Sequence, residues 1–399
     1  MYLLNKIFNV IKKIKDFFYS IFSVFCLIFI KLLNVFIIIR FNYIDRGRIG
    51  GFYPVEFYRI KKRNSKTKYF DIFLCDQLTD HYNEDWYLFW KSKFNILYLG
   101  RFSYIFCKIN KKYFGKKNLI PYKDFDKFPI SGELINIIDE NYYLDKMVIN
   151  SNILSQAKPF FNKHGLLKNQ FICFHNRDKA FLNKYRPKID WSYHDYRDSS
   201  IKNYVKSINY FSQKNIKAIR IGETAEEKLS IKNANIIDYP FSDEKKSSID
   251  LSLLSESKFS ILSETGLSLV PFVFRKPIVF VNWVLLEAIH TYKEGIFILK
   301  KVFSIKEKKY LKFYEIIKYI GKSGDGKYYK ENFIFEENNQ DDILDACLEM
   351  NDFLDGKFKY TTHDNDLQTK FWKSLGKKFY KNKKFRIGKN FLIKNQNLI

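Results

Sequence analysis

Several predicted strands in the second half of the chain end in polar loops whose side chains are suited to binding a phosphorylated ligand. The residues that we predict to bind it are His175, Arg177, Asp178, Arg197, Arg220, Gly222, Ser263, Glu264, Thr265 and Gly266. Arginine binds phosphate through two parallel hydrogen bonds, and histidine can donate to the same group. We expect Asp178 to orient Arg177. A salt bridge between these two residues, without any ligand, is the competing interpretation.

The segment Ser263–Gly266 lies between a predicted strand and a predicted helix. Thr265 can cap the helix, and Gly266 lets a ligand approach backbone N–H groups that bind anions. Glu264 at the tip of the loop could accept hydrogen bonds from ribose hydroxyls. An ordinary helix cap explains the same residues without a ligand.

Three residues are candidates for a catalytic base. His194 and Asp195 belong to the loop 193–198, which packs a histidine, an arginine and two acids into six residues before a predicted helix. The pKa of histidine is ordinarily about 6.5, so His194 could carry a proton in either direction. Glu56 in the first half of the chain is the third candidate. A solvated cluster at a helix start is the alternative for the loop.

A glycine-rich loop precedes the helix that bears Glu56. Its glycines are Gly47, Gly50 and Gly51. They could cradle a diphosphate or allow two domains to approach closely. A glycine-rich linker that leaves the apolar segment is the competing interpretation. The loop is not a P-loop, because no Gly-Lys-Ser/Thr ending follows it.

The sequence gives no sign of a bound metal or cofactor. It contains no HExxH motif and no GxSxG motif, and its five cysteines form no CxxC pair. We therefore expect no obligatory metal, no cofactor, no disulfide framework and reduced thiols.

Elements of α/β type must position these residues. Apolar runs at 170–174, 217–221, 234–238, 258–262 and 277–281 alternate with amphipathic stretches, which predicts a doubly wound parallel sheet. Strands at 70–74 and 95–99 and a helix at 54–63 predict a similar unit earlier in the chain. The predicted divisions of the chain are 1–40, 41–165, 166–345 and 346–399.

Residues 1–40 are apolar apart from a basic flank and a lysine near the middle of the apolar stretch, Lys31. A helix of about 20 apolar residues can span a bilayer, whereas an amphipathic one lies in the interface. We favour the interfacial interpretation over the spanning one and over a buried core helix. The net charge of +26 suits an anionic membrane surface, and no nucleic-acid-binding module is present.

Several segments together resemble bacterial glycosyltransferases of surface-polysaccharide clusters. They include RGRIG near residue 46, FICFHNRD, YHDYRDSSIKNY, IIDYPFS and SETGLSLVPFVFRKPIVFVN. The resemblance implies a GT-B-like pair of Rossmann-like domains behind a membrane-associated helix. The acceptor domain would be 41–165 and the donor domain 166–345, followed by a helical basic tail. The HNRD turn is similar to the phosphate-binding loop of fucosyltransferase-like enzymes, which would place His175 and Arg177 on the donor diphosphate.

The function implied is transfer of a hexosyl or deoxyhexosyl group from a nucleotide-sugar donor to a glycan or lipid-linked acceptor. It would not require a metal, and the expected location is the cytoplasmic face of the plasma membrane. The leaving-group charge would be neutralised by Arg177, Arg197 or Arg220. The alternatives are a nucleotide-sugar epimerase of similar fold and a non-catalytic protein that binds the membrane surface.

Overall fold

The computed structural model describes residues 2–62, 69–76, 81–120, 147–286, 289, 294–320, 326–376 and 385–399. The chain forms two compact units, Met1–Lys123 and Asp124–Ile399. Each unit contains a parallel sheet with helices packed on it, and an apolar helix precedes the first sheet. The predicted α/β class is therefore confirmed.

The first unit is built on a three-stranded parallel sheet of order β1-β2-β3. Its elements are α1 (Tyr2–Leu33), β1 (Ile39–Asp45), α2 (Tyr53–Lys62), β2 (Phe70–Asp76), α3 (Glu84–Lys91), β3 (Ile96–Tyr98) and α4 (Arg101–Ile109). Ile39 pairs with Phe70, and Phe73 pairs with Ile96. The helix predicted at 54–63 and the strands predicted at 70–74 and 95–99 correspond to α2, β2 and β3.

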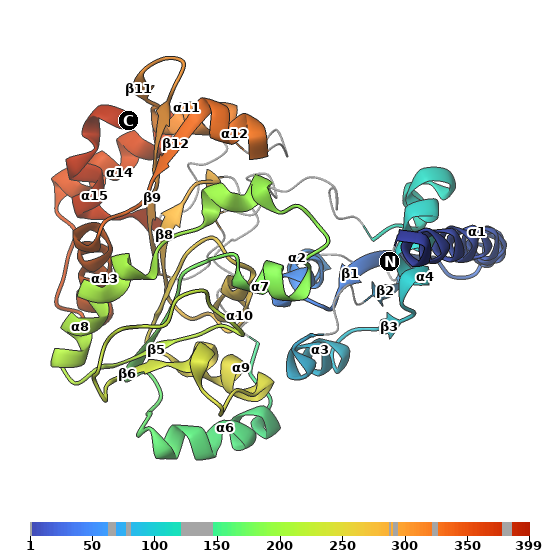
Figure 1. Ribbon diagram of the computed structural model, residues 1–399, viewed down its shortest axis with the longest axis horizontal. Coiled ribbons are helices and arrows are strands. Elements are labelled where there is room, and N and C mark those ends of the chain that lie inside the picture. Colours follow the sequence, from blue (N-terminus) through green and yellow to red (C-terminus); the bar gives the residue numbers. More distant parts are fainter. Residues whose placement is uncertain are drawn as a thin grey trace. The chain divides into compact units, whose positions relative to one another are not determined.

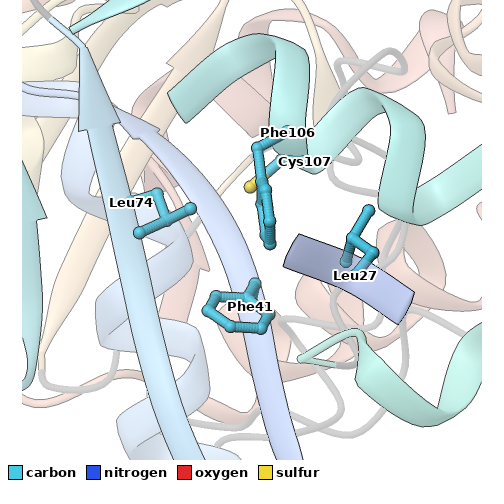
Figure 2. Close-up of a cluster of buried hydrophobic side chains, with 5 residues drawn as sticks. All are labelled: Leu27, Phe41, Leu74, Phe106 and Cys107. Carbon is cyan, nitrogen blue, oxygen red and sulfur yellow. The ribbon is translucent and has the colours of Figure 1, made fainter. Parts of the chain in front are cut away.

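The core of the first unit joins α1 to the sheet. Figure 2 shows Leu27 of α1 facing the same buried cluster as Phe41 of β1, Leu74 of β2, and Phe106 and Cys107 of α4. Leu27 is 1% exposed. Figure 1 shows α1 in dark blue beside α4. The C-terminal part of α1 is thus packed into the first unit.

The second unit is built on a seven-stranded parallel sheet of order β13-β9-β8-β7-β4-β5-β6. The strands of this sheet are β4 (Phe171–His175), β5 (Lys217–Arg220), β6 (Ile236–Asp238), β7 (Ser260–Leu262), β8 (Ile278–Trp283), β9 (Gly295–Leu299) and β13 (Phe385–Ile387). A smaller antiparallel sheet consists of β10 (Lys301–Ser304), β11 (Lys309–Tyr310) and β12 (Phe333–Glu336). The five strands predicted for the larger sheet are all present.

Helices cover both faces of the large sheet (Figure 1). The helices of the second unit are α6 (Ser151–Lys163), α7 (Ala180–Tyr185), α8 (Val205–Gln213), α9 (Ser247–Glu256), α10 (Leu269–Val273), α11 (Phe313–Tyr319), α12 (Gly326–Asn332), α13 (Gln340–Leu354), α14 (Thr362–Ser374) and α15 (Lys389–Lys394). Because both faces are covered, central strands such as β8 are buried along their whole length. That burial is why the strands read as continuous apolar runs in the sequence.

The predicted domain limits at residues 165 and 346 stay predictions. Helix α6 precedes the first limit and packs on α9, while β13 follows the second and pairs with β9. All five cysteines are free, as expected from their spacing, and all but Cys26 are buried.

Candidate functional site

The strand order of the second unit marks one place on its sheet where a ligand is expected. The chain fills positions on one side of β4 with β5 and β6, and then crosses to the other side for β7, β8 and β9. In doubly wound sheets, ligands bind outside the carboxyl ends of the strands at such a switch point. The loops there follow β4 and β7, and they are joined because the backbone N–H of Arg177 donates to Ser263 Oγ at 2.6 Å.

Arg177 lies at this edge as predicted, but its partner differs from the one expected. Its guanidinium pairs with Asp198 and donates to the carbonyl oxygen of His194 at 3.2 Å. The side chain is 11% exposed. The expectation that Asp178 orients Arg177 is wrong, because the carboxylate of Asp178 accepts the backbone N–H groups of Ala180 and Glu226, each at 3.0 Å.

A second arginine from the same loop reaches the β7 end. Arg197 pairs with the Glu264 carboxylate at 3.0 Å and donates to the Glu264 carbonyl oxygen at 2.8 Å. Glu264 is 2% exposed, and its other carboxylate oxygen lies 3.4 Å from the backbone nitrogens of Val284 and Leu285. The side chain of Glu264 is therefore turned into the protein. This orientation does not fit the predicted hydrogen bonds from Glu264 to ribose hydroxyls. Glu264 instead fixes Arg197 beside the β7 loop.

Lys300, at the end of β9, is the third cation at this edge. It is 2% exposed, and its Nζ donates to the carbonyl oxygen of Asp198 at 2.5 Å. Burial lowers the pKa of Lys300 to about 8 and the pKa of Arg177 to about 10. Both groups carry a proton at neutral pH, but the surrounding carboxylates do not fully offset the cost of burying their charge. An anion that arrives at this edge would offset more of it. We call Arg177, Arg197 and Lys300 the cation cluster.

His175 is held as a neutral side chain. Its Nδ1 lies 2.9 Å from the carbonyl oxygen of Ile221, which can only accept, so Nδ1 carries the proton. Burial lowers the pKa of His175 to about 4. Its Nε2 is then an acceptor, which argues against the predicted donation to phosphate and suits a ligand hydroxyl. Gly222, with φ of 136°, packs against this ring, where a Cβ atom would lie 3.2 Å from Nδ1.

Arg220 is buried by its neighbours and does not open onto the edge. It is 1% exposed, pairs with Asp238 at 3.3 Å and donates to Asn176 Oδ1 at 3.0 Å. It also donates to the carbonyl oxygen of Glu227 at 2.6 Å. These contacts tie the loops after β4 and β5 to the end of β6. Arg220 thus positions the loops, and the predicted direct contact with a ligand is not what its geometry favours.

The remaining residues of the β7 loop support the turn. The hydroxyl of Thr265 accepts the backbone N–H of Leu267 at 3.4 Å, and its carbonyl oxygen accepts the hydroxyl of Ser268 at 2.6 Å. Thr265 is therefore a cap, as predicted. Gly266 begins the short helical turn that follows.

The three predicted bases are all engaged by cations. Arg197 lies 3.3 Å from His194 Nδ1, and because a guanidinium only donates, that nitrogen accepts. Asp195 pairs with Lys179 at 3.1 Å and with Lys330 at 3.0 Å.

Glu56 belongs to the first unit, where it is fully buried. It forms a bidentate pair with Arg59 at 2.7 and 2.9 Å. The catalytic base is therefore left open by the geometry.

The glycine-rich loop follows β1, so it is a strand-to-helix connection of the first unit. This placement excludes the interpretation as a linker that leaves the apolar segment. The N–H of Gly47 donates to Asp45 Oδ1 at 3.0 Å, and Arg48 pairs with Asp45 at 3.0 Å. A Cβ atom on Gly51 would overlap the carbonyl oxygen of Asp45, so close backbone packing requires glycine there.

Two residues of the site were absent from the predicted set. Asp198 closes the loop that begins at Tyr193, but its pairing with Arg177 spans 21 residues and leaves no local pattern. Lys300 directly follows the apolar run Gly295–Leu299, and a cation at the end of a strand is the signal that could have identified it. Among the described residues, no group of three or more His, Cys, Asp or Glu side chains could hold a metal ion.

Comparisons with known proteins show only distant structural likeness. No protein-family model matches the sequence, and no curated protein matches it. A family 9 glycosyl transferase from Veillonella parvula is 12% identical, with a TM-score of 0.43 over 78% of this chain and 96% of that one. The E. coli heptosyltransferase WaaC with ADP is 11% identical, with a TM-score of 0.27 over 71% of this chain and 87% of that one.

The iron-containing dodecameric glycosyltransferase TibC from enterotoxigenic E. coli is 10% identical, with a TM-score of 0.31 over 63% of this chain and 62% of that one. Scores and identities this low do not establish membership of a family. The residues of the cation cluster, and their place in the fold, carry the functional argument.

Proposed function

We propose that the chain is a glycosyltransferase that binds a nucleotide-sugar donor at the carboxyl edge of β4 and β7. The observation that carries the proposal is the cation cluster at the switch point of a parallel sheet. Arg177, Arg197 and Lys300 lie where such sheets bind nucleotides, and they are held by partners that fix their positions.

The chemistry that such a site supports is displacement at the anomeric carbon. The acceptor hydroxyl forms a bond to that carbon while the bond from carbon to the diphosphate oxygen breaks. The electron pair leaves with the nucleoside diphosphate, and the acceptor proton passes to a base. Cations already fixed at the diphosphate stabilise the charge that develops there without reorganising during the reaction. We propose that the cation cluster has this role and that no metal is required.

The roles of the other residues follow from their contacts. His175, neutral and with Nε2 as an acceptor, is suited to a sugar or ribose hydroxyl. Asp198 and Glu264 position the two arginines. The base stays a prediction among His194, Asp195 and Glu56.

The acceptor that we propose is a glycan carried on a lipid, used at the cytoplasmic face of the plasma membrane. Among the described residues one helical stretch, Val10–Leu33, is long and apolar enough to cross a membrane. It belongs to the first unit, to which we assign the acceptor. The cation cluster would bind the diphosphate and not the sugar, so the choice between a hexosyl and a deoxyhexosyl group depends on other residues.

The test is a panel of nucleotide sugars incubated with the purified full chain, with released nucleoside diphosphate as the readout. We expect one donor to give release that increases with added lipid-linked acceptor and persists in EDTA. Conversion of the sugar without release would indicate an epimerase instead. Absence of both release and binding across the panel would contradict the proposal and favour a non-catalytic membrane protein.

A further inference from the structure

The inward face of α1 is the more polar face of the helix. Ser23 is fully buried, and its hydroxyl donates to the carbonyl oxygen of Tyr19 at 2.6 Å. Asp16 pairs with Arg101 of α4 at 3.0 Å. Asn34, just beyond the helix, exchanges side-chain hydrogen bonds with Asn118 at 2.9 Å. These polar groups recur at the spacing of one helix face, and that face packs on the protein.

The outward face of α1 is apolar. Its side chains are 37–67% exposed and comprise Val10, Ile11, Ile14, Phe17, Phe18, Ile21, Phe22, Val24, Phe25, Ile28, Phe29 and Leu32. The apolar face continues into the next turn, where Val35 is 83% and Phe36 88% exposed. A helix on the surface of a water-soluble protein has the reverse arrangement, with its apolar side inward. An apolar surface of this extent requires a cover other than water.

The packing of α1 against the first unit argues against a spanning helix. Contacts with α4 run from Asp16, which pairs with Arg101, to Leu27, which shares the buried cluster in Figure 2. At 1.5 Å per residue this is about 17 Å of helix in contact with the unit. A helix that crossed the hydrocarbon would take α4 and the end of the sheet with it, where their polar groups would lack water. Only the outward face of α1 is therefore available to lipid.

Exposed cations lie on α1 and on α4, the helix that packs beside it. They are Lys12, Lys13, Lys15 and Lys31 on α1, and Lys108, Lys111 and Lys112 at the end of α4 and just after it. Tyr113 beside them is 66% exposed. Lysine and tyrosine next to an apolar surface are typical of the level of lipid headgroups. This charge favours an anionic bilayer over a neutral apolar partner.

We propose that α1 and the turn 34–37 form a monotopic docking surface for an anionic lipid bilayer. The helix lies in the plane of one leaflet, with its polar face on the first unit and its apolar face in the lipid. Lys15 and Lys31 then both lie at headgroup level on the same side of the membrane. The proposal does not depend on the reaction assigned to the second unit.

The first test is binding of the full chain to vesicles. We expect sedimentation with phosphatidylglycerol vesicles and weaker sedimentation with phosphatidylcholine vesicles. Phe18→Glu and Phe25→Glu should each lower the bound fraction about tenfold or more, because each removes apolar burial and adds a charge. Leu167→Glu alters an apolar side chain of the second unit that is 61% exposed, and it should bind as the wild type does.

Unchanged binding of both phenylalanine variants would contradict the proposal. So would a stable dimer, in the absence of lipid, that dissociates in those variants, because a second copy of the chain would then cover α1. Circular dichroism of each variant shows whether it is folded.

The second test distinguishes a helix in the plane from one that spans. In a Cys26→Ser background the remaining native cysteines are buried. Lys13→Cys and Lys31→Cys are then probed singly with a membrane-impermeant maleimide on intact vesicles to which the protein was added from outside. We expect both to be labelled to the same extent as in detergent. Protection of either position until detergent is added would show that α1 spans and would overturn the in-plane arrangement.

Discussion

The carboxyl edge of β4 and β7 buries charge, whereas the outward face of α1 exposes apolar side chains. Both regions depart from the usual distribution, in which charged groups lie outside and apolar groups inside. At the strand edge each buried charge has a partner, as Arg197 has in Glu264 at 3.0 Å. On α1 the apolar side chains of the outward face stay 37–67% exposed, although Phe22 at the margin of that face contacts the ring of Phe102.

The difference shows how each region depends on its surroundings. A buried charge must be compensated within the fold, so the two arginines of the cation cluster are held by carboxylates and Lys300 by a backbone carbonyl oxygen. An exposed apolar face can be compensated from outside, by a bilayer. Substitutions at the carboxyl edge of β4 and β7 should therefore affect folding and ligand binding. Substitutions on the outward face of α1 should affect partitioning into lipid.

The largest expected effect concerns Glu264. Removing one partner of a buried pair leaves the other charge uncompensated, so Glu264→Ala should lower the free energy of unfolding by about 3–5 kcal/mol. Urea unfolding in detergent measures it. The matched control is Glu244→Ala, whose pair with Lys163 is exposed and should contribute less than about 1 kcal/mol. Equal losses in both variants would show that the strand edge is not a tightly coupled buried network.

The next effect compares the two faces of α1. Leu27 is 1% exposed, and Leu27→Ala should cost about 2–5 kcal/mol of unfolding free energy. Phe25 is 67% exposed, and Phe25→Ala should change that free energy by less than about 0.5 kcal/mol. Vesicle binding should show the reverse order, with the larger loss for Phe25→Ala. If both variants lose stability equally, the outward face is packed in the folded protein.

The smallest expected effect is the pH dependence contributed by Lys300. Burial lowers its pKa to about 8 from the ordinary 10.5, so between these values the unfolded chain binds more protons than the folded chain. Stability due to this group therefore rises with pH in that window. Between pH 8 and 9.5 the wild type should gain about 1–2 kcal/mol relative to Lys300→Met. A constant difference between the two proteins would mean that Lys300 has an ordinary pKa.

Much of the fold was predictable because buried parallel strands are apolar along their whole length. Strand β1 was missed, since Arg40, Asn42 and Asp45 interrupt its apolar pattern and it adjoins the apolar stretch that precedes it. Arg40 is compensated by Asp71 of β2 at 2.6 Å, a contact that exists only once the strands pair. The three-residue strand β13 was missed for a similar reason, because its partner β9 lies far away in the sequence.

The candidate site was predictable in position and less so in its contacts. Arg177 and Ser263 were correctly predicted to lie together, because each follows a parallel strand and the carboxyl ends of parallel strands converge. The partner of Arg177 was wrong, since Asp178 is adjacent in the sequence but caps backbone groups instead. Asp198 pairs with Arg177 instead, because the loop 192–198 folds back onto the end of β4. The spacing of residues in the sequence does not predict that fold of the loop.

The most direct test of the cation cluster is calorimetric titration of nucleoside diphosphates into the full chain and two arginine variants. Loss of a charge-assisted contact to phosphate costs about 1.5–3 kcal/mol, so Arg177→Ala should weaken binding about ten- to a hundred-fold. Arg177→Lys should restore only part of it, because an ammonium lacks the planar fork. Arg386→Ala, on the edge strand β13, removes an arginine that stacks on Tyr360 at 3.5 Å and should leave affinity unchanged. Wild-type affinity in a folded Arg177→Ala protein would contradict a donor site at the β4–β7 edge.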